Sequence, residues 1–248
     1  MLRRPLSAVA LSGCSLIQDS GPSTTQQRDV EGITAVELDT SGDLTVTLGE
    51  ATSLSVTAGE KVINRLTSTV EDGTLRLGVS GQTLSFGGEI RYELTVPSLE
   101  SIVVQGSGDA DVDLSGATAP VITVKGSGEV TATGLTADTA SITVDGSGSV
   151  EAGEIQVQRL TVRIDGSGEI TANGGAASQS VDIRGSGDYH GSDLRSTDAK
   201  VVVRGAGGAH VHVTGDLVAT IDGSGDIRHS GGAHVTKDVS GSGEVVAD

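Results

Sequence analysis

The segment VITVKGSGEV, residues Val121–Val130, decides the fold of this 248-residue chain. Related segments follow as SITVDGSGSV, residues 141–150, and TVRIDGSGEI, residues 161–170. Each of them places alternating apolar residues on both sides of a Gly-Ser-Gly unit. An alternation with a period of two is typical of strands with one buried face, so each segment predicts two strands joined by a sharp corner.

The corner recurs through the second half of the chain at intervals of 18 to 20 residues. The first glycines of the corners are Gly106, Gly126, Gly146, Gly166, Gly185, Gly205, Gly223 and Gly241. Such a repeat predicts a solenoid in which each coil buries its inner face only against its neighbours. We therefore expect an all-β fold, a single-stranded right-handed parallel β-helix with coils of about 20 residues.

Branched apolar residues form columns when the coils are superimposed. Two positions before each first glycine stand Val104, Val124, Val144, Ile164, Ile183, Val203, Ile221 and Val239. Such side chains pack well on a pleated surface, so we expect this column inside the coils. The first and third residues of each corner lack a Cβ, which allows a positive φ where the chain turns sharply.

The composition limits both the core and the partners. The chain has no Trp, one Phe and two Tyr, so the interior must be narrow and filled by small branched side chains. Its formal net charge is −17, from 33 acidic and 16 basic residues. This charge repels phosphate backbones, so we expect no nucleic-acid partner.

The amino terminus has the layout of an export signal. Residues 1–13 contain Arg3 and Arg4, then a short apolar segment and small residues. The run LSGC, residues 11–14, resembles a bacterial lipobox, in which cleavage precedes the cysteine and its thiol carries a diacylglycerol. We expect a lipoprotein signal peptide over residues 1–13 and lipid attachment at Cys14. The other interpretation is an unmodified cysteine near a flexible terminus.

The remaining boundaries follow from composition and periodicity. Residues 14–29 are polar and aperiodic, so we expect a flexible linker. Residues 30–248 are expected to form one β-solenoid domain, with irregular first coils over 30–100 and regular Gly-Ser-Gly coils over 101–248. After Cys14 no apolar run approaches the ~20 residues that span a bilayer, so the predicted membrane contact is through lipid.

Two further segments carry a resemblance to a known family. They are LDTSGDLTV, residues 38–46, and VPSLESIVVQGSGD, residues 96–109, which accompany the export signal and the repeated corners. With them the chain resembles the auto-transporter adhesin head family, also called the GIN domain or DUF2807, over about residues 30–248. The resemblance implies a parallel β-helix exposed at the cell envelope, often lipid-anchored, with no assigned catalytic residues.

One residue beyond each corner the chain is mostly acidic. This acidic row consists of Asp109, Glu129, Ser149, Glu169, Asp188, Gly208, Asp226 and Glu244. A series of Ca²⁺ sites is one interpretation, because Ca²⁺ prefers several carboxylate and carbonyl oxygens. We favour the other, in which these side chains cap backbone amides of the corners.

Two outward positions carry further charged or metal-binding residue types. The residues before the corners carry charges of both signs and predict weak ion pairs between coils. They are Lys125, Asp145, Asp165, Arg184, Arg204 and Asp222. His190 and His210 share one outward column in neighbouring coils, but no well-placed third ligand joins them. We expect a solvated pair and no metal.

These features predict a non-catalytic cell-envelope lipoprotein, held outside the cytoplasm by lipidated Cys14. Its rigid solenoid would serve as an adhesin-like binding surface or as an envelope scaffold, without a cofactor, for a cell-surface glycan or protein. The alternative is a calcium-dependent glycan binder or a carbohydrate-active enzyme built on the same rod. A groove with an isolated carboxylate pair would favour an enzyme, whereas a uniform exposed face would favour the scaffold.

Overall fold

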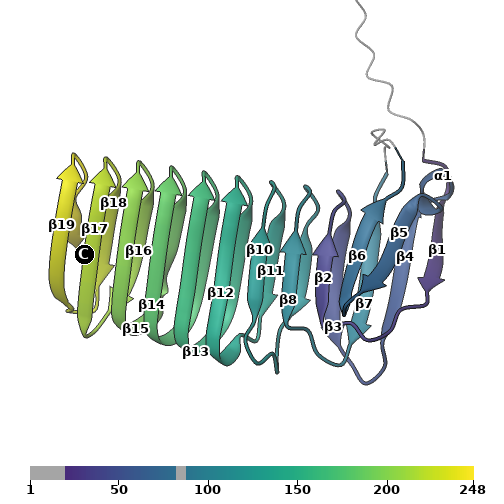
Figure 1. Cartoon of the computed structure of the whole chain (residues 1–248), viewed down its shortest axis with the longest axis horizontal. Helices are drawn as coiled ribbons and strands as arrows, with labels where there is room; N and C mark the ends of the chain where they lie inside the picture. The colour runs from purple at the N-terminus through teal and green to yellow at the C-terminus, as the bar shows by residue number, and fades with distance from the viewer. Residues whose placement is uncertain (1–19, 82–87) are drawn as a thin grey trace, which may run out of the picture.

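The protein, seen in a computed structural model, is a rod of stacked β-coils (Figure 1). The structure describes residues 20–81 and 88–248. The predicted lipid site Cys14, the signal peptide of residues 1–13 and the start of the linker lie outside the described residues. Strands make up 68% of the chain and helix 2%, which confirms the predicted all-β solenoid of parallel coils.

The described elements are short near the amino terminus and longer in the regular coils. The strands are β1 (Ser23–Arg28), β2 (Ala35–Leu38), β3 (Asp43–Leu48), β4 (Ser53–Gly59), β5 (Leu66–Glu71), β6 (Thr74–Val79), β7 (Arg91–Val96), β8 (Ser101–Val104), β9 (Ala110–Asp113), β10 (Val121–Val124), β11 (Glu129–Thr133), β12 (Thr136–Gly146), β13 (Ser149–Gly166), β14 (Glu169–Gly185), β15 (Asp188–Gly205), β16 (Gly208–Val213), β17 (Asp216–Gly223), β18 (Asp226–Ser230), β19 (His234–Gly241) and β20 (Val245–Ala247). One helix, α1 (Glu60–Ile63), interrupts them. Among the described residues no helix has the length and apolar character of a membrane span.

Each coil has one strand before its corner and one after it. On the pre-corner face the strands stack in the order β6, β2, β8, β10, β12, the later parts of β13 to β15, β17 and β19. On the post-corner face the order is β7, β3, β9, β11, the first parts of β13 to β15, β16, β18 and β20. All of these pairs are parallel, so equivalent residues of successive coils lie side by side.

The two glycines of a corner have different roles. Gly146 has a φ of 142°, a conformation that favours glycine. Gly148 does not have a positive φ, so the prediction of positive φ was wrong there. A Cβ on Gly148 would instead lie 2.4 Å from the carbonyl oxygen of Gly128 and 2.6 Å from Cγ1 of Val124. The third glycine is therefore required by the close approach of neighbouring coils.

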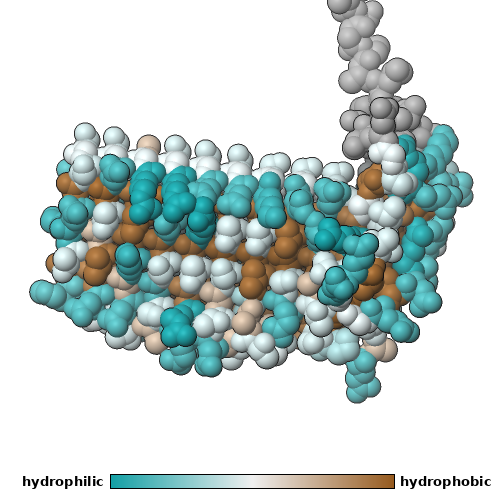
Figure 2. Space-filling model, in the orientation of Figure 1, coloured by the Kyte–Doolittle hydropathy of each residue, from teal (hydrophilic) through white to brown (hydrophobic). Residues whose placement is uncertain are grey.

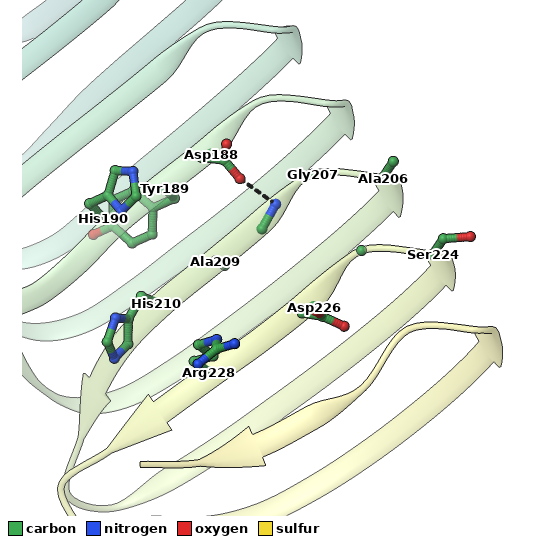
Figure 3. A pocket seen from close by; sticks show the side chains of 12 residues that line it. Asp188, Tyr189, His190, Ala206, Gly207, Ala209, His210, Ser224, Asp226 and Arg228 are labelled. Atoms are coloured by element: carbon green, nitrogen blue, oxygen red, sulfur yellow. Dashed lines mark hydrogen bonds between the residues drawn. The ribbon is translucent and has the colours of Figure 1, made fainter.

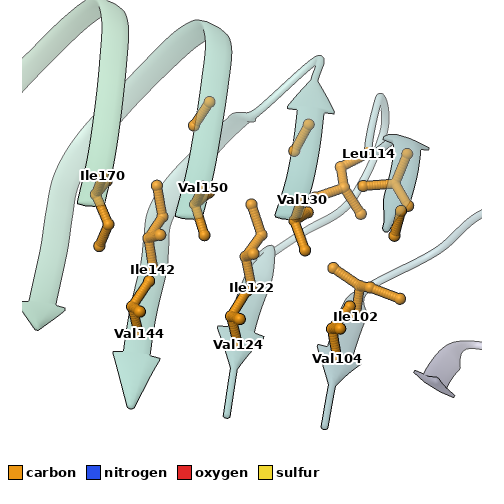
Figure 4. Close-up of a cluster of buried hydrophobic side chains, with 14 of the residues drawn as sticks. Ile102, Val104, Leu114, Ile122, Val124, Val130, Ile142, Val144, Val150 and Ile170 are labelled. Atoms are coloured by element: carbon orange, nitrogen blue, oxygen red, sulfur yellow. The ribbon is translucent and has the colours of Figure 1, made fainter. Parts of the chain in front are cut away.

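The predicted column of branched residues forms the centre of the rod. In Figure 4, Val104, Val124 and Val144 follow one another from coil to coil. The column is no more than 1% exposed from Val104 to Ile221. Val239 of the last coil is 39% exposed because only one neighbouring coil covers it. Stacking between coils, rather than a separate layer, therefore buries the core.

The coils near the amino terminus do not stack in chain order. Strand β2 lies between β6 and β8, and β3 lies between β7 and β9. In space, β2 and β3 therefore form the second coil from this end of the rod. The chain then continues through β4, α1 and β5, forms the outermost coil with β6 and β7, and returns to the third coil at β8. We expected irregular first coils over residues 30–100 but not this order, because pairing between distant segments leaves no local pattern.

Antiparallel strands extend this end of the rod. Strand β4 pairs with β7, and β1 pairs with β4, so Ser23–Arg28 forms an edge strand where we expected part of a flexible linker. The hydroxyl oxygens of Thr25 and Thr57 are 2.8 Å apart across this pair. Strand β1 has no buried residue, so its sequence lacks the apolar alternation that would have revealed it.

Candidate functional site

Aspartates of the acidic row join neighbouring coils on the post-corner face. Each of three aspartates accepts a hydrogen bond from the backbone amide of the equivalent residue in the next coil. The distances from Oδ1 to the amide nitrogen are 2.9 Å for Asp109 and Glu129, 2.8 Å for Asp188 and Gly208, and 3.0 Å for Asp226 and Glu244. These bonds confirm the predicted amide-capping role at the three aspartates.

One coil interrupts this surface. Ala206 stands where the other seven corners carry Ser, and Gly208 stands where the other coils carry an acidic residue or Ser. The register places Gly208 between Asp188 and Asp226. The result is an open cavity of about 310 Å³, shown in Figure 3. We call it the notch and define it by Asp188, His190, Gly208, His210, Asp226 and Arg228.

The walls of the notch present both acceptors and donors. Asp188 and Asp226 each use one oxygen to hold a backbone amide, and the second oxygen has no partner among the described residues. Arg228 makes no hydrogen bond or ion pair within the same residues. His190 lies with Nε2 3.3 Å from Oε1 of Glu169. The notch therefore combines two carboxylates, each with one oxygen available to accept hydrogen bonds from a ligand, with a guanidinium that can donate to a ligand.

A buried polar chain of hydrogen bonds begins at Tyr189, one of the residues that line the notch. The Tyr189 hydroxyl donates to Oε1 of Gln179 at 3.0 Å, and Nε2 of Gln179 donates to the Ser196 hydroxyl at 2.8 Å. The Ser196 hydroxyl donates to the His212 carbonyl at 3.1 Å. Burial raises the pKa of Tyr189 above its usual value. These hydrogen bonds hold the Tyr189 side chain in place at the notch.

The two predicted neighbouring histidines do lie in register. His190 of β15 is opposite His210 of β16, and each imidazole has a carboxylate beside it, from Glu169 and Asp248 respectively. In residues 20–81 and 88–248, no group of three or more His, Cys, Asp or Glu side chains is arranged to hold a metal. The arrangement thus offers hydrogen-bonding imidazoles at one end of the notch.

Of the predicted ion pairs on the pre-corner face, the structure confirms Asp165 with Arg184, whereas Arg204 pairs with Asp182, a residue outside the predicted column. Arg204 lies 2.9 Å from the Asp182 carboxylate in the preceding coil, and Arg184 lies 3.9 Å from that of Asp165. A hydrogen bond to Asp165 raises the pKa of Arg163 in the same strand. Arg184 and Arg204 are exposed and their aspartate partners are partly exposed, so each pair stabilises the fold only weakly. This face also has an open hollow of about 350 Å³ beside Ser178, Lys200 and Val218.

The notch lies outside the predicted sites, although the sequence carries a signal for it. Gly208 belongs to the acidic row but has no side chain. Ala206 and Gly208 together remove two side chains from one outward patch of a single coil. A departure of this kind from an otherwise regular column is visible in the aligned repeats.

The family described as "Putative auto-transporter adhesin, head GIN domain" matches residues 32–233. The chain belongs to this family. The resemblance inferred from the corners and from residues 38–46 and 96–109 is therefore confirmed. The matched range contains the whole notch and all of the regular coils except the last.

Solved structures show the same fold at low sequence identity. A "Putative lipid binding protein" from Parabacteroides distasonis is 24% identical to this GIN-domain chain, and a "putative adhesin" from the same organism is 23% identical. Both structures have a TM-score of 0.83, and each match covers 93% of this chain and 99% of the other. A "putative adhesin" from Parabacteroides merdae is 20% identical, with a TM-score of 0.77 and coverage of 92% and 97%. No curated protein matches the chain.

Family and fold together make this GIN-domain protein an adhesin-like β-solenoid. An adhesin-like family points to a cell-surface or extracytoplasmic protein.

Proposed function

We propose that the protein is a non-catalytic lipoprotein of the cell envelope whose rigid solenoid serves as an adhesin-like binding surface or as an envelope scaffold. The observation that supports this function best is the regular outer face. The acidic row repeats from coil to coil, and hydrogen bonds from three of its aspartates join neighbouring coils. In Figure 2, evenly spaced groups follow one edge of the rod. A stiff, repetitive surface suits attachment and presentation.

A carbohydrate-active enzyme is the second candidate, because the notch contains a carboxylate pair. Asp188 and Asp226 are two coils apart, or roughly 9.5 Å at the usual strand spacing, which is within the range for inverting glycosidases. Both side chains are exposed, however, whereas a general acid needs an environment that keeps its carboxyl protonated. Incubation with neutral polysaccharides should therefore release no reducing ends. Release that disappears in Asp226→Asn would instead establish the enzyme.

Lipidation of Cys14 is the proposed route to the membrane. A Cys14→Ser variant should lose the incorporation of labelled fatty acid and should move from the membrane to the soluble fraction. Acyl chains supply the membrane affinity at ~0.8 kcal/mol per buried CH₂, and the acidic solenoid supplies none. Fractionation of Cys14→Ser with membranes would refute the anchor.

Adhesion itself is tested with the soluble domain. Residues 20–248 coated on beads should bind cells or extracted envelope more strongly than beads coated with an unrelated acidic protein. If cells retain both kinds of bead equally, the adhesin-like role is refuted and the scaffold role remains.

A further inference from the structure

The fold does not require glycine at the centre of the notch. Gly208 does not have a positive φ, and a Cβ built on it would approach only Oδ1 of Asp188 closely, at 2.9 Å. That oxygen belongs to the end of a flexible exposed side chain, so a small rotation would make room. The corner glycines differ, because a Cβ on Gly207 would lie 2.1 Å from the carbonyl oxygen of Gly187. The gap at Gly208 is thus a property of the surface rather than a demand of the backbone.

The size and spacing of the gap limit what can occupy it. The cavity of about 310 Å³ lies at the small end of ligand pockets, so it accepts one or two rings rather than a protein segment. Asp188 and Asp226 stand on opposite sides of Gly208 and are roughly 9.5 Å apart at the usual strand spacing. A ring with hydroxyl groups on opposite edges can donate to both carboxylates at once.

The charges exclude several other ligand classes. An anionic ligand would meet the carboxylates of Asp188 and Asp226 on a chain of net charge −17. A strongly cationic ligand would meet the unpaired Arg228 in the wall. An apolar ligand would cover Arg228 and the second oxygens of the two aspartates without offering them hydrogen bonds. A metal ion would lack the three-ligand group that is absent from residues 20–81 and 88–248.

We infer that the notch binds a neutral glycan, with one sugar ring seated over Gly208 between Asp188 and Asp226. Sugar hydroxyls donate to the second oxygens of the two aspartates, and Arg228 donates to a ring or hydroxyl oxygen. Hydrogen bonds to charged groups of this kind are stronger than those between neutral groups. Binding is independent of calcium, because the first oxygen of each aspartate already accepts a backbone amide. The inference rests on the proposed function and names its ligand class.

Gly208→Glu tests the site with little change to the fold. It restores the acidic row as in the coil of Glu169 and places a side chain where the ring would lie. The matched control is Ser149→Glu, which adds the same charge to the same row three coils away. A second test variant, Arg228→Gln, removes the donor without filling the cavity. Thermal unfolding of all three variants shows whether they remain folded.

The probes are an array of neutral, sialylated and sulfated oligosaccharides, followed by titration of the neutral glycans that bind. We expect wild type to bind neutral glycans equally well with calcium or with a chelator. Gly208→Glu and Arg228→Gln should weaken that binding by about tenfold or more, and Ser149→Glu should change it by less than about twofold.

Three results would overturn the inference. The first is that Gly208→Glu binds neutral glycans as wild type does. The second is that wild type binds only anionic glycans, and the third is that wild type binds no glycan on the array. If wild type still binds cells while the array stays empty, the notch inference fails and the proposed adhesin-like surface stands. If Gly208→Glu binds neutral glycans less but adheres to cells as wild type does, the notch is a glycan site distinct from the adhesive surface.

Discussion

At the residue scale, the repeated glycines are fixed by what surrounds each of them. The corner glycines are needed for a positive φ at Gly146 and for the close approach of coils at Gly148. Gly208 has neither constraint. The same residue type therefore marks a structural requirement in one column and an open surface in another.

Gly148→Ala should lower the free energy of unfolding by about 2 kcal/mol or more, because its Cβ would overlap the Gly128 carbonyl oxygen and the Val124 side chain. Gly175→Ala is the matched control, since its Cβ would have no neighbour closer than 3.6 Å. That change should stay within about 0.5 kcal/mol. Urea unfolding of both variants measures the difference, and equal stabilities would contradict the close-stacking argument.

The buried phenol of Tyr189 makes the stability of the fold depend on pH. Its pKa is raised by burial, so the folded protein keeps the phenol protonated after the unfolded chain has begun to ionise. This contribution to stability is fully present below the unfolded pKa of about 10 and is lost as the pH rises above it. The loss amounts to about 1.4 kcal/mol for each pH unit above that value.

Tyr189→Phe should therefore have two opposite effects. At neutral pH it should cost about 1 to 3 kcal/mol, because the buried Oε1 of Gln179 loses its donor. Above pH ~10 its stability should fall less steeply than that of wild type, since one ionising group has been removed. Denaturant unfolding over a series of alkaline pH values measures both effects. Identical slopes in the two proteins would show that Tyr189 does not titrate with unfolding.

At the element scale, a strand gains its stability from the coils on both of its sides. Val203 and Val239 occupy the same inward column, yet Val203 is 0% exposed and Val239 is 39% exposed. Val203→Ala should cost about 2 kcal/mol, from two lost methyl groups and the cavity they leave. Val239→Ala should cost less than half as much. If thermal unfolding shows that both variants lose the same stability, neighbouring coils do not determine how much a column residue stabilises the fold.

The strands of the regular coils could be predicted from the sequence because each column repeats. Ile122 and Val124 have equivalents in the next coils, so the alternation is read many times over. Strand β1 could not be found this way, because its residues are polar and its partner β4 is distant in the sequence. The position of β2 between β6 and β8 was hidden for the same reason.

The candidate site was only half predicted. The neighbouring positions of His190 and His210 followed from their equal distance from the corner, and the structure places them in register. The notch needed a different kind of evidence, namely a side chain that is missing. A column is recognised from the residues that fit it, whereas Gly208 carries information because it does not fit.

At the scale of the whole molecule, the rod is a one-dimensional array with unequal ends. The amino-terminal end is extended by β4, β1 and α1, whereas β19 and β20 each pair with a single strand within the described part of the chain. Most residues of β19 are exposed. In such an array the stability of a coil depends on its immediate neighbours. Opening should therefore begin at the carboxyl-terminal end.

Hydrogen exchange should reveal this order in the native protein. The amides of β19 and β20 should exchange first, those of β17 and β18 next, and those of β13 to β15 last, because the interior coils have partners on both sides. Val203→Ala should speed exchange most in β15 and its neighbours and leave β2 and β3 little changed. If wild type is protected uniformly along the rod, and if Val203→Ala lowers protection equally in every strand, the solenoid opens as a single unit.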